Sequence, residues 1–213
     1  MKKPIVRIVT ISDTHNKHNH IQRLPDADII ICAGDYTLRG TVPEVNAFLH
    51  WFSNLDYEHK ILVNGNHEVG FQKNPELYKQ LIPDNIIYLE NESVEIDGLK
   101  IYGSPHSPEF FYWAYMFERG HQARKIWARI PDDADIVVTH GPAYGYGDLT
   151  GMSQAGEDPH VGCRDLLNRL LEVKPLVAIS GHIHAAYGYD RNRDTLFINS
   201  SICDEAYNVT RKL

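Results

Sequence analysis

The sequence has few cysteines and no long apolar run, and each of these two shortages excludes a class of protein. The three cysteines, Cys32, Cys163 and Cys203, are an odd number without paired spacing. We therefore expect no disulfide framework, and we expect the protein to work in a reducing compartment, the cytoplasm. No stretch approaches the roughly 20 consecutive apolar residues of a membrane-spanning helix. The short apolar run near the start is broken by Arg7, unlike a signal peptide, so we expect no membrane association.

Basic residues are fewer than acidic residues, which argues against non-specific binding to duplex nucleic acid. Lysine and arginine number 21 against 28 aspartate and glutamate residues, a formal net charge of −7. Non-specific binding to duplex nucleic acid needs a basic face that displaces counterions from phosphates, and we expect none here. The content of 43% hydrophobic and 23% charged residues is typical of a globular protein, and the length predicts a single domain over residues 1–213.

Short apolar runs alternate with helix-like segments along the chain. Nine runs predict buried strands, at residues 5–11, 28–33, 60–63, 86–89, 93–96, 99–102, 135–139, 176–180 and 195–199. A capping-box pattern at Thr41 and Glu44 predicts the start of one helix, and apolar residues at helical spacing predict two more over residues 122–130 and 162–173. This alternation predicts the α/β class.

Some of the sheet structure is expected to be antiparallel. Asp97 and Gly98 lie between the runs at 93–96 and 99–102, and this dipeptide is a strong signal for a two-residue hairpin. Two irregular stretches, residues 103–120 and 142–160, are too long for ordinary connections, and loops of this length are usually functional.

Five short polar blocks each follow an apolar run directly. They contain the side chains Asp13, His15, Asp35, Asn66, His67, His140, His182 and His184. Because ligands bind at the carboxyl ends of the strands in open α/β sheets, we expect these eight side chains to converge on one edge. Buried charges and imidazoles are costly unless they are paired or bound to metal, so packing alone does not account for such a cluster.

The spacing within the blocks suits metal ligation. Asp13 and His15 are two residues apart in an extended segment and project to the same side, as do His182 and His184. Oxygen and nitrogen donors without thiolate suit manganese, iron, zinc or cobalt better than calcium. Eight side chains are too many for one tetrahedral ion, so we expect two divalent ions roughly 3.5–4 Å apart that share a carboxylate. Asp35 is the candidate for that bridge, and manganese is the metal we expect, with iron, zinc, cobalt or magnesium as alternatives.

The ordered set of blocks resembles the calcineurin-like metallophosphoesterase superfamily over most of the chain, from Asp13 to His184. Further stretches at residues 60–68, 101–105, 140–142 and 162–163 are similar to the small metallophosphoesterase-domain-containing proteins, a group associated with hydrolysis of cyclic nucleotides and other phosphodiesters. The resemblance implies a four-layer α/β/β/α sandwich with two mixed sheets and a dinuclear metal centre between their edges.

The resemblance also implies a role for each residue. The first metal ion would be held by Asp13, His15 and His184, the second by Asn66, His140 and His182, and Asp35 would bridge them. His67 would contact the phosphate and protonate the leaving group, while its competing interpretation is a histidine that merely orders its loop. We expect a hydroxide between the ions to attack phosphorus in line, with no covalent phosphoenzyme.

The substrate is less well defined by the sequence. We expect a phosphodiesterase that acts on nucleotide-type or similar small phosphodiesters. The nearest alternative is a phosphomonoesterase (including a protein phosphatase), and a third is a catalytically silent protein-binding scaffold. The aromatic stretch at residues 109–117 is interpreted as a hydrophobic lid or a dimer contact, and stacking on a nucleobase is the competing interpretation. The physiological substrate and the oligomeric state are left open.

Overall fold

The computed structural model describes residues 5–151 and 158–211. Within these ranges the elements follow one another as β1 (Ile8–Ile11), η1 (His18–His20), β2 (Ile29–Ala33), α1 (Val42–Ser53), β3 (His59–Val63), α2 (Val69–Lys73), α3 (Pro75–Lys79), β4 (Ile87–Tyr88), β5 (Glu92–Ile96), β6 (Leu99–Ser104), β7 (Ser107–Pro108), β8 (Met116–Phe117), α4 (His121–Trp127), β9 (Ile136–Thr139), α5 (Arg164–Val173), β10 (Val177–Ser180), η2 (His184–Ala186), β11 (Gly188–Arg191) and β12 (Leu196–Asn199).

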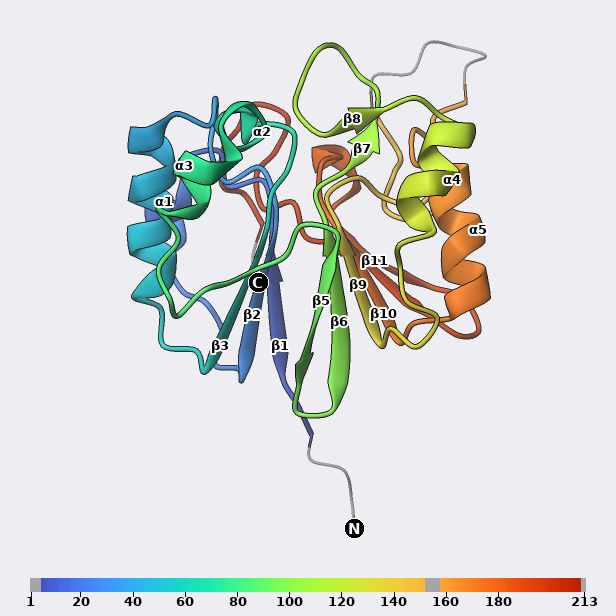
Figure 1. Cartoon of the computed structure of the whole chain (residues 1–213), viewed down its shortest axis with the longest axis horizontal. Helices are drawn as coiled ribbons and strands as arrows, with labels where there is room; N and C mark the ends of the chain where they lie inside the picture. The colour runs from blue at the N-terminus through green and yellow to red at the C-terminus, as the bar shows by residue number, and fades with distance from the viewer. Residues whose placement is uncertain (1–4, 152–157, 212–213) are drawn as a thin grey trace.

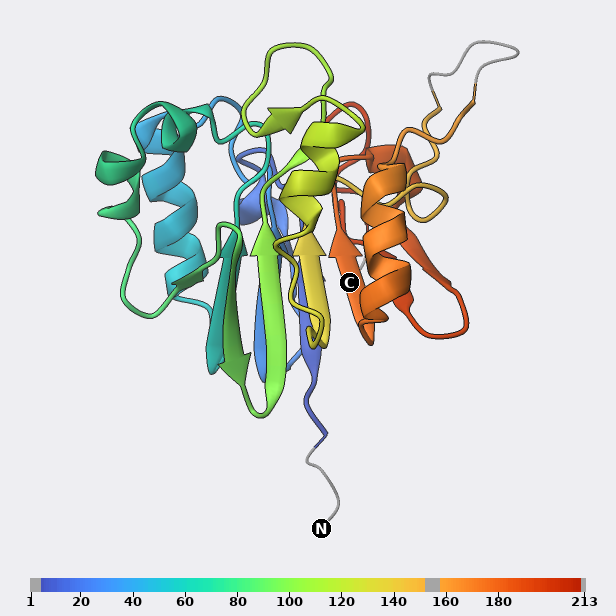
Figure 2. The same ribbon diagram turned by 45° about the vertical axis from the view of Figure 1, so that its right-hand side comes forward.

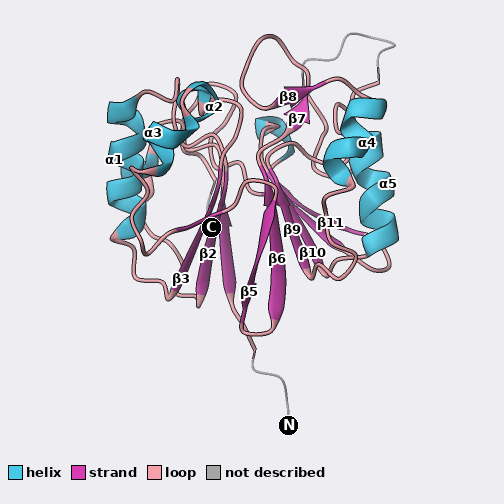
Figure 3. Cartoon of the chain, viewed as in Figure 1, coloured by secondary structure: helices cyan, strands magenta, loops and turns pink. Residues whose placement is uncertain are grey.

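The elements form four layers (Figure 1), and the predicted α/β sandwich is confirmed. A sheet with the order β1-β2-β3-β4 faces a second sheet with the order β11-β12-β10-β9-β6-β5. The two sheets pack face to face in the centre, with helices on both outer sides (Figure 3). Helices α4 and α5 cover the outer face of the second sheet (Figure 2).

Successive side chains of a strand point to opposite faces of its sheet, and this alternation forms the three apolar interfaces between the four layers. In β2, Ile29, Ile31 and Ala33 face the second sheet, and Ile30 and Cys32 face the helical side with α1. All five β2 residues are buried, as expected for a strand covered on both faces. On the other side of the molecule, a third cluster packs the second sheet against α4 and α5.

Each of the nine predicted strand regions contains a strand, but the expectation of two mixed sheets is wrong for one of them. The six-stranded sheet is mixed, because β5–β6 and β11–β12 pair antiparallel while its central pairs are parallel. The four-stranded sheet is parallel in every pair. Each of its successive strands is reached through a helical or long loop connection rather than a hairpin, and such connections return the chain in the same direction.

The predicted local features match the structure closely. Glu44 and Thr41 form the capping box of α1, and Asp97 and Gly98 turn the β5–β6 hairpin with φ of 51° and 77°. The predicted long loops are at the same end as the polar blocks. The first contains the short strands β7 and β8, whereas part of the second, residues 152–157, lies outside the described residues.

Candidate metal centre

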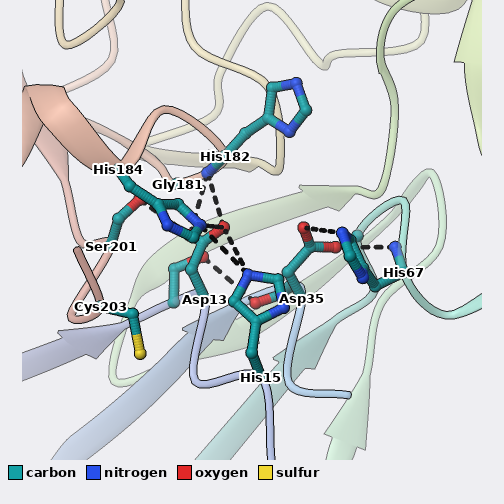
Figure 4. A network of polar contacts seen from close by, with 12 residues as sticks. Asp13, His15, Asp35, His67, Gly181, His182, His184, Ser201 and Cys203 are labelled. Carbon is teal, nitrogen blue, oxygen red and sulfur yellow. Dashed lines mark hydrogen bonds and ion pairs between the residues drawn. The ribbon is translucent and has the colours of Figure 1, made fainter. Parts of the chain in front are cut away.

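All eight predicted site residues follow the carboxyl ends of parallel strands, and the structure brings them to one edge of the two sheets. Figure 4 labels Asp13, His15, Asp35, His67, His182 and His184 among them. The first sheet supplies the residues after β1, β2 and β3, and the second sheet supplies those after β9 and β10. Six of the eight are buried: Asp13, His15, Asp35, Asn66, His67 and His140. Two sheet edges therefore meet at a shared polar cluster.

The backbone at these loops is held in a conformation that non-glycine residues seldom adopt. Asp13, His15, Asp35 and His182 have φ of 56°, 42°, 52° and 68°. Such left-handed residues persist only where surrounding contacts fix them, and they concentrate at functional sites. Here the loops fix one another, because the Asp13 N–H donates to the Gly34 carbonyl at 2.9 Å and the His15 N–H donates to the Asp35 carbonyl at 3.1 Å.

One group of ligand atoms joins Asp13, His15 and His184. The Nδ1 atom of His15 lies 3.2 Å from the Thr37 carbonyl and that of His184 lies 2.8 Å from the Asp204 carbonyl. A carbonyl only accepts hydrogen bonds, so each Nδ1 carries a hydrogen, and in the neutral ring each Nε2 offers a lone pair. These two Nε2 atoms are 3.1 Å apart, with Asp13 Oδ1 at 3.3 Å from that of His184. Such a convergence of acceptors fits a cation.

A second group is built around His140 on the other side of Asp35. The Nδ1 atom of His140 bonds to the Ala33 carbonyl at 2.9 Å, and its Nε2 faces Asn66 Oδ1 at 2.9 Å and Asp35 Oδ2 at 3.2 Å. His182 offers a ring nitrogen within 4.8 Å of the ligand atoms of Asp35 and His140. Asp35 also belongs to a group with His15 and His67, so its carboxylate lies between the two sets.

The electrostatics of the cluster also indicate a place for cations. Burial alone would lower the pKa of His140 and His184, but the hydrogen bonds and charges of Asp35 and Asp13 outweigh it and raise the pKa of each to about 9. Burial would likewise raise the pKa of Asp13, yet His184 holds it well below its usual range. The two imidazoles thus attract a proton strongly at the very nitrogens that face the other acceptors.

Burial has the opposite result at His15 and His182. It lowers the pKa of His15 to about 4, and together with the charge of His140 it lowers that of His182 to about 4. Both rings are therefore neutral near pH 7, the form in which a histidine binds metal.

Several residues that support the cluster carry no signal that sequence reasoning used. Ser201, which follows β12, donates its hydroxyl to Asp13 Oδ2 at 2.8 Å. The Asn199 amide donates to the carbonyls of Gly147 and Ile183 at 2.8 and 2.9 Å and so fixes the turn that carries His182. Both lie at or after the end of the last strand, where no recognisable motif marks them.

Glu68 directly follows His67 in the sequence and is not among the predicted site residues. Its carboxylate is completely buried and accepts from the backbone N–H groups of Gly65, Asp35 and Thr37 and from the Thr37 hydroxyl, at 2.7 to 3.0 Å. Burial and the charge of Asp35 raise its pKa to about 7. Glu68 therefore ties the loop that bears Asp35 to the loop that bears Asn66 and His67.

A cavity of about 910 Å³ opens over the cluster. Its floor includes His15, Asp35, Asn66 and His67, and two aromatic side chains from distant parts of the sequence, Trp113 and Tyr207, also line it. The Tyr207 ring meets the His15 ring edge-on at 4.4 Å.

The aromatic stretch covers the apolar core only in part. Phe110, Phe111 and Tyr112 are exposed, whereas Ala114, Tyr115 and Phe117 are buried.

Comparison with known proteins identifies the class that this fold and cluster define. Residues 6–186 match the model of the calcineurin-like phosphoesterase family, and the chain belongs to that family. Membership of this family supports the activity of a metal-dependent phosphoester hydrolase for this chain, and it implies divalent metal ions and phosphoester substrates.

Among individual relatives, the chain is 36% identical over 224 residues to metallophosphoesterase domain-containing protein 1 of Homo sapiens, covering 94% of this chain and 67% of that protein. It is also 36% identical to UPF0046 protein C25E10.12 of Caenorhabditis elegans over 216 residues, 93% of this chain and 76% of the other. The resemblance of the sequence to this family is thus confirmed.

Solved structures agree at the level of the fold. The crystal structure of the protein TT1561 of Thermus thermophilus superposes with a TM-score of 0.61 at 13% identity, over 92% of this chain and 90% of that one. Within residues 5–151 and 158–211, no helix combines the length and the apolar character that a membrane crossing requires.

Proposed function

We propose that the chain is a phosphodiesterase that holds two divalent metal ions and hydrolyses small phosphodiesters of nucleotide type. The observation that carries this proposal is the pair of acceptor clusters on either side of Asp35. One contains Asp13, His15 and His184, and the other is centred on His140. Two clusters with a carboxylate between them are the arrangement that a pair of ions requires.

The assignment of ligands follows the clusters. Asp13, His15 and His184 would hold the first ion, Asn66, His140 and His182 the second, and Asp35 both. Ions bound there would lower the pKa of a water molecule and offset the charge of the phosphoryl oxygens. The set of oxygen and nitrogen donors suits manganese, which we propose as the metal. In His15, His140 and His184 the second ring nitrogen is already fixed by a backbone carbonyl, which orients the ring toward its ion.

We infer that His67 acts on the leaving group. Its Nδ1 lies 2.7 Å from the Leu38 carbonyl and therefore carries a hydrogen, so Nε2 is the atom left to exchange a proton in the cavity. That Nε2 lies 3.8 Å from Asp35 Oδ2. As the oxygen of a water molecule bonds to phosphorus, the P–O bond to the leaving group breaks, and the proton on Nε2 passes to the departing oxygen. The proton from the attacking water leaves to solvent.

The cavity supports a substrate with an apolar or aromatic portion beside the phosphate. Its volume of about 910 Å³ lies within the range of small-molecule sites. Trp113 and Tyr207 line it, and aromatic rings stack readily on nucleobases. We also propose that residues 1–213 work as one metallophosphoesterase domain in a cytoplasmic setting, which the three free, buried cysteines favour.

The test compares hydrolysis of bis(p-nitrophenyl) phosphate and p-nitrophenyl phosphate by the manganese-loaded protein, with Asp35→Ala as the control. We expect faster cleavage of the diester and no turnover above background in Asp35→Ala. Faster cleavage of the monoester would replace the proposal by a phosphomonoesterase. Cleavage of neither, with fewer than two ions bound per chain, would favour a protein-binding scaffold.

A further inference from the structure

The imidazole of His67 is enclosed by aromatic side chains in addition to its hydrogen bond. The Trp113 indole stacks on one face, with ring centroids 4.3 Å apart and an angle of 20° between the planes. The His15 ring meets His67 edge-on at 4.6 Å and 75°. Together with the bond from Nδ1 to the Leu38 carbonyl, these contacts leave the ring little freedom to turn about its side-chain torsions.

The segment that presents Trp113 is itself bonded to the loop that carries His67. The Ala114 N–H donates to the Asn66 carbonyl at 3.1 Å, and the Asn64 amide donates to the Tyr115 hydroxyl at 3.2 Å. Ala114 and Tyr115 are 1% and 6% exposed, and Tyr115 has the unusual φ of 55°. Trp113 is thereby fixed relative to His67 by the residues that follow it, although Trp113 itself is 36% exposed and Phe110, Phe111 and Tyr112 before it are also exposed.

We propose that Trp113 is a positioning residue for His67: its indole holds the imidazole in the orientation from which Nε2 reaches the leaving group. The inference rests on the proposed function, in which His67 supplies that proton. Proton transfer depends steeply on the placement of the donor, and a donor held by packing as well as by a hydrogen bond is better placed than one held by the bond alone. The aromatic stretch then contributes a residue to the reaction and not only a surface.

The test uses two diesters that differ in their need for a proton. p-Nitrophenolate leaves bis(p-nitrophenyl) phosphate unaided, whereas the more basic phenolate of diphenyl phosphate benefits from an acid. For Trp113→Leu we expect kcat on diphenyl phosphate to fall roughly 10- to 100-fold and kcat on the nitrophenyl ester to change less than about threefold. Trp113→Phe keeps a ring to stack and should recover most of the loss. Tyr189→Ala, which removes an exposed ring outside the cavity, should match the unmodified protein on both esters.

His67→Ala separates failure of this inference from failure of the proposed function. If His67→Ala loses no more on diphenyl phosphate than on the nitrophenyl ester, the acid role of His67 is wrong and Trp113 has nothing to position. The inference is overturned if His67→Ala selectively loses activity on diphenyl phosphate and Trp113→Leu does not. It is also overturned if the fold-loss of the double variant equals the product of the two single losses, because Trp113 then acts independently of His67. A double variant no slower than His67→Ala supports it. Metal content and circular dichroism of each variant exclude loss of ions or fold as the cause.

Discussion

Two adjacent serines after β12 allow a direct measurement of how the cluster is supported. The hydroxyl of Ser201 donates to the Asp13 carboxylate at 2.8 Å, and that of Ser200 donates to the Thr10 hydroxyl at 2.9 Å. Both serines are buried, at 0% and 2% exposure, and replacement by alanine removes one oxygen atom in each case. The two substitutions are therefore matched in size, burial and position and differ in the charge of the acceptor.

The charge of the acceptor sets the expected difference. A hydrogen bond to a charged group contributes about 1.5–3 kcal/mol and a bond between neutral groups about 0.5–1.5 kcal/mol. Asp13 keeps its two contacts from the His182 N–H, at 3.1 and 2.9 Å, so it is weakened in Ser201→Ala but not left without partners. We expect Ser201→Ala to lower the free energy of unfolding of the metal-free protein by about 2 kcal/mol and Ser200→Ala by about 1 kcal/mol.

Metal affinity should separate the two variants more sharply. Loss of a residue that orients a ligand typically weakens metal binding about 10- to 100-fold, and of these two serines only Ser201 orients a proposed ligand. Urea unfolding of the chelated proteins gives the stabilities, and calorimetric titration with Mn²⁺ gives the affinities. Equal Mn²⁺ affinity in Ser200→Ala and Ser201→Ala would refute the reasoning, because it would show that the Asp13 carboxylate needs no support from its neighbour to bind metal.

Two further predictions concern the cluster as a whole. In Gly181→Ala the new Cβ would overlap Ser12 Oγ and Asp13 Oδ2, so we expect a loss of about 3 kcal/mol in unfolding free energy together with loss of bound metal. Among the described residues, the nearest atom to a Cβ at Gly151 is Glu205 Oε1 at 3.5 Å, so Gly151→Ala should be neutral by the same urea and metal assays. The pKa values of His140 and His184 are raised to about 9 from an unfolded value of about 6.5, so protonation of these two rings stabilises the folded protein. This stabilisation is fully present below about pH 6.5 and is lost as the pH rises toward 9. The melting temperature of the chelated protein should therefore fall over this window. Metal needs unprotonated imidazole, so the gain in melting temperature from saturating Mn²⁺ should grow over the same window, and an identical trend with and without metal would contradict the assignment.

The sequence predicted the position of the cluster because each polar block directly follows a run of buried strand residues. Strands that run parallel end at one edge, so Asp13, Asp35 and His140 were expected together although 127 residues separate the first from the last. The hairpin at Asp97 and Gly98 and the capping box at Thr41 were predicted for equally local reasons. Strand β11 was missed, since its residues Gly188–Arg191 are largely exposed and carry no apolar run.

What the sequence did not predict depends on tertiary contacts. Ser201 reaches Asp13 across 188 positions, and nothing near Ser201 marks it as a partner of a carboxylate. Trp113 stands among other aromatic residues, and only tertiary contacts, such as the bond between Ala114 and Asn66, bring its ring rather than a neighbouring one onto His67. The parallel order of the first sheet was also not predicted, because strand runs identify strands but not the direction of their pairing.

The central claim, two ions that share Asp35, is tested most directly by anomalous diffraction from crystals of the manganese-loaded protein at the manganese edge. We expect two peaks of comparable height, one among Asp13, His15 and His184 and one among Asn66, His140 and His182, each within bonding distance of Asp35. A single peak, or a pair of peaks that Asp35 does not join, would contradict it.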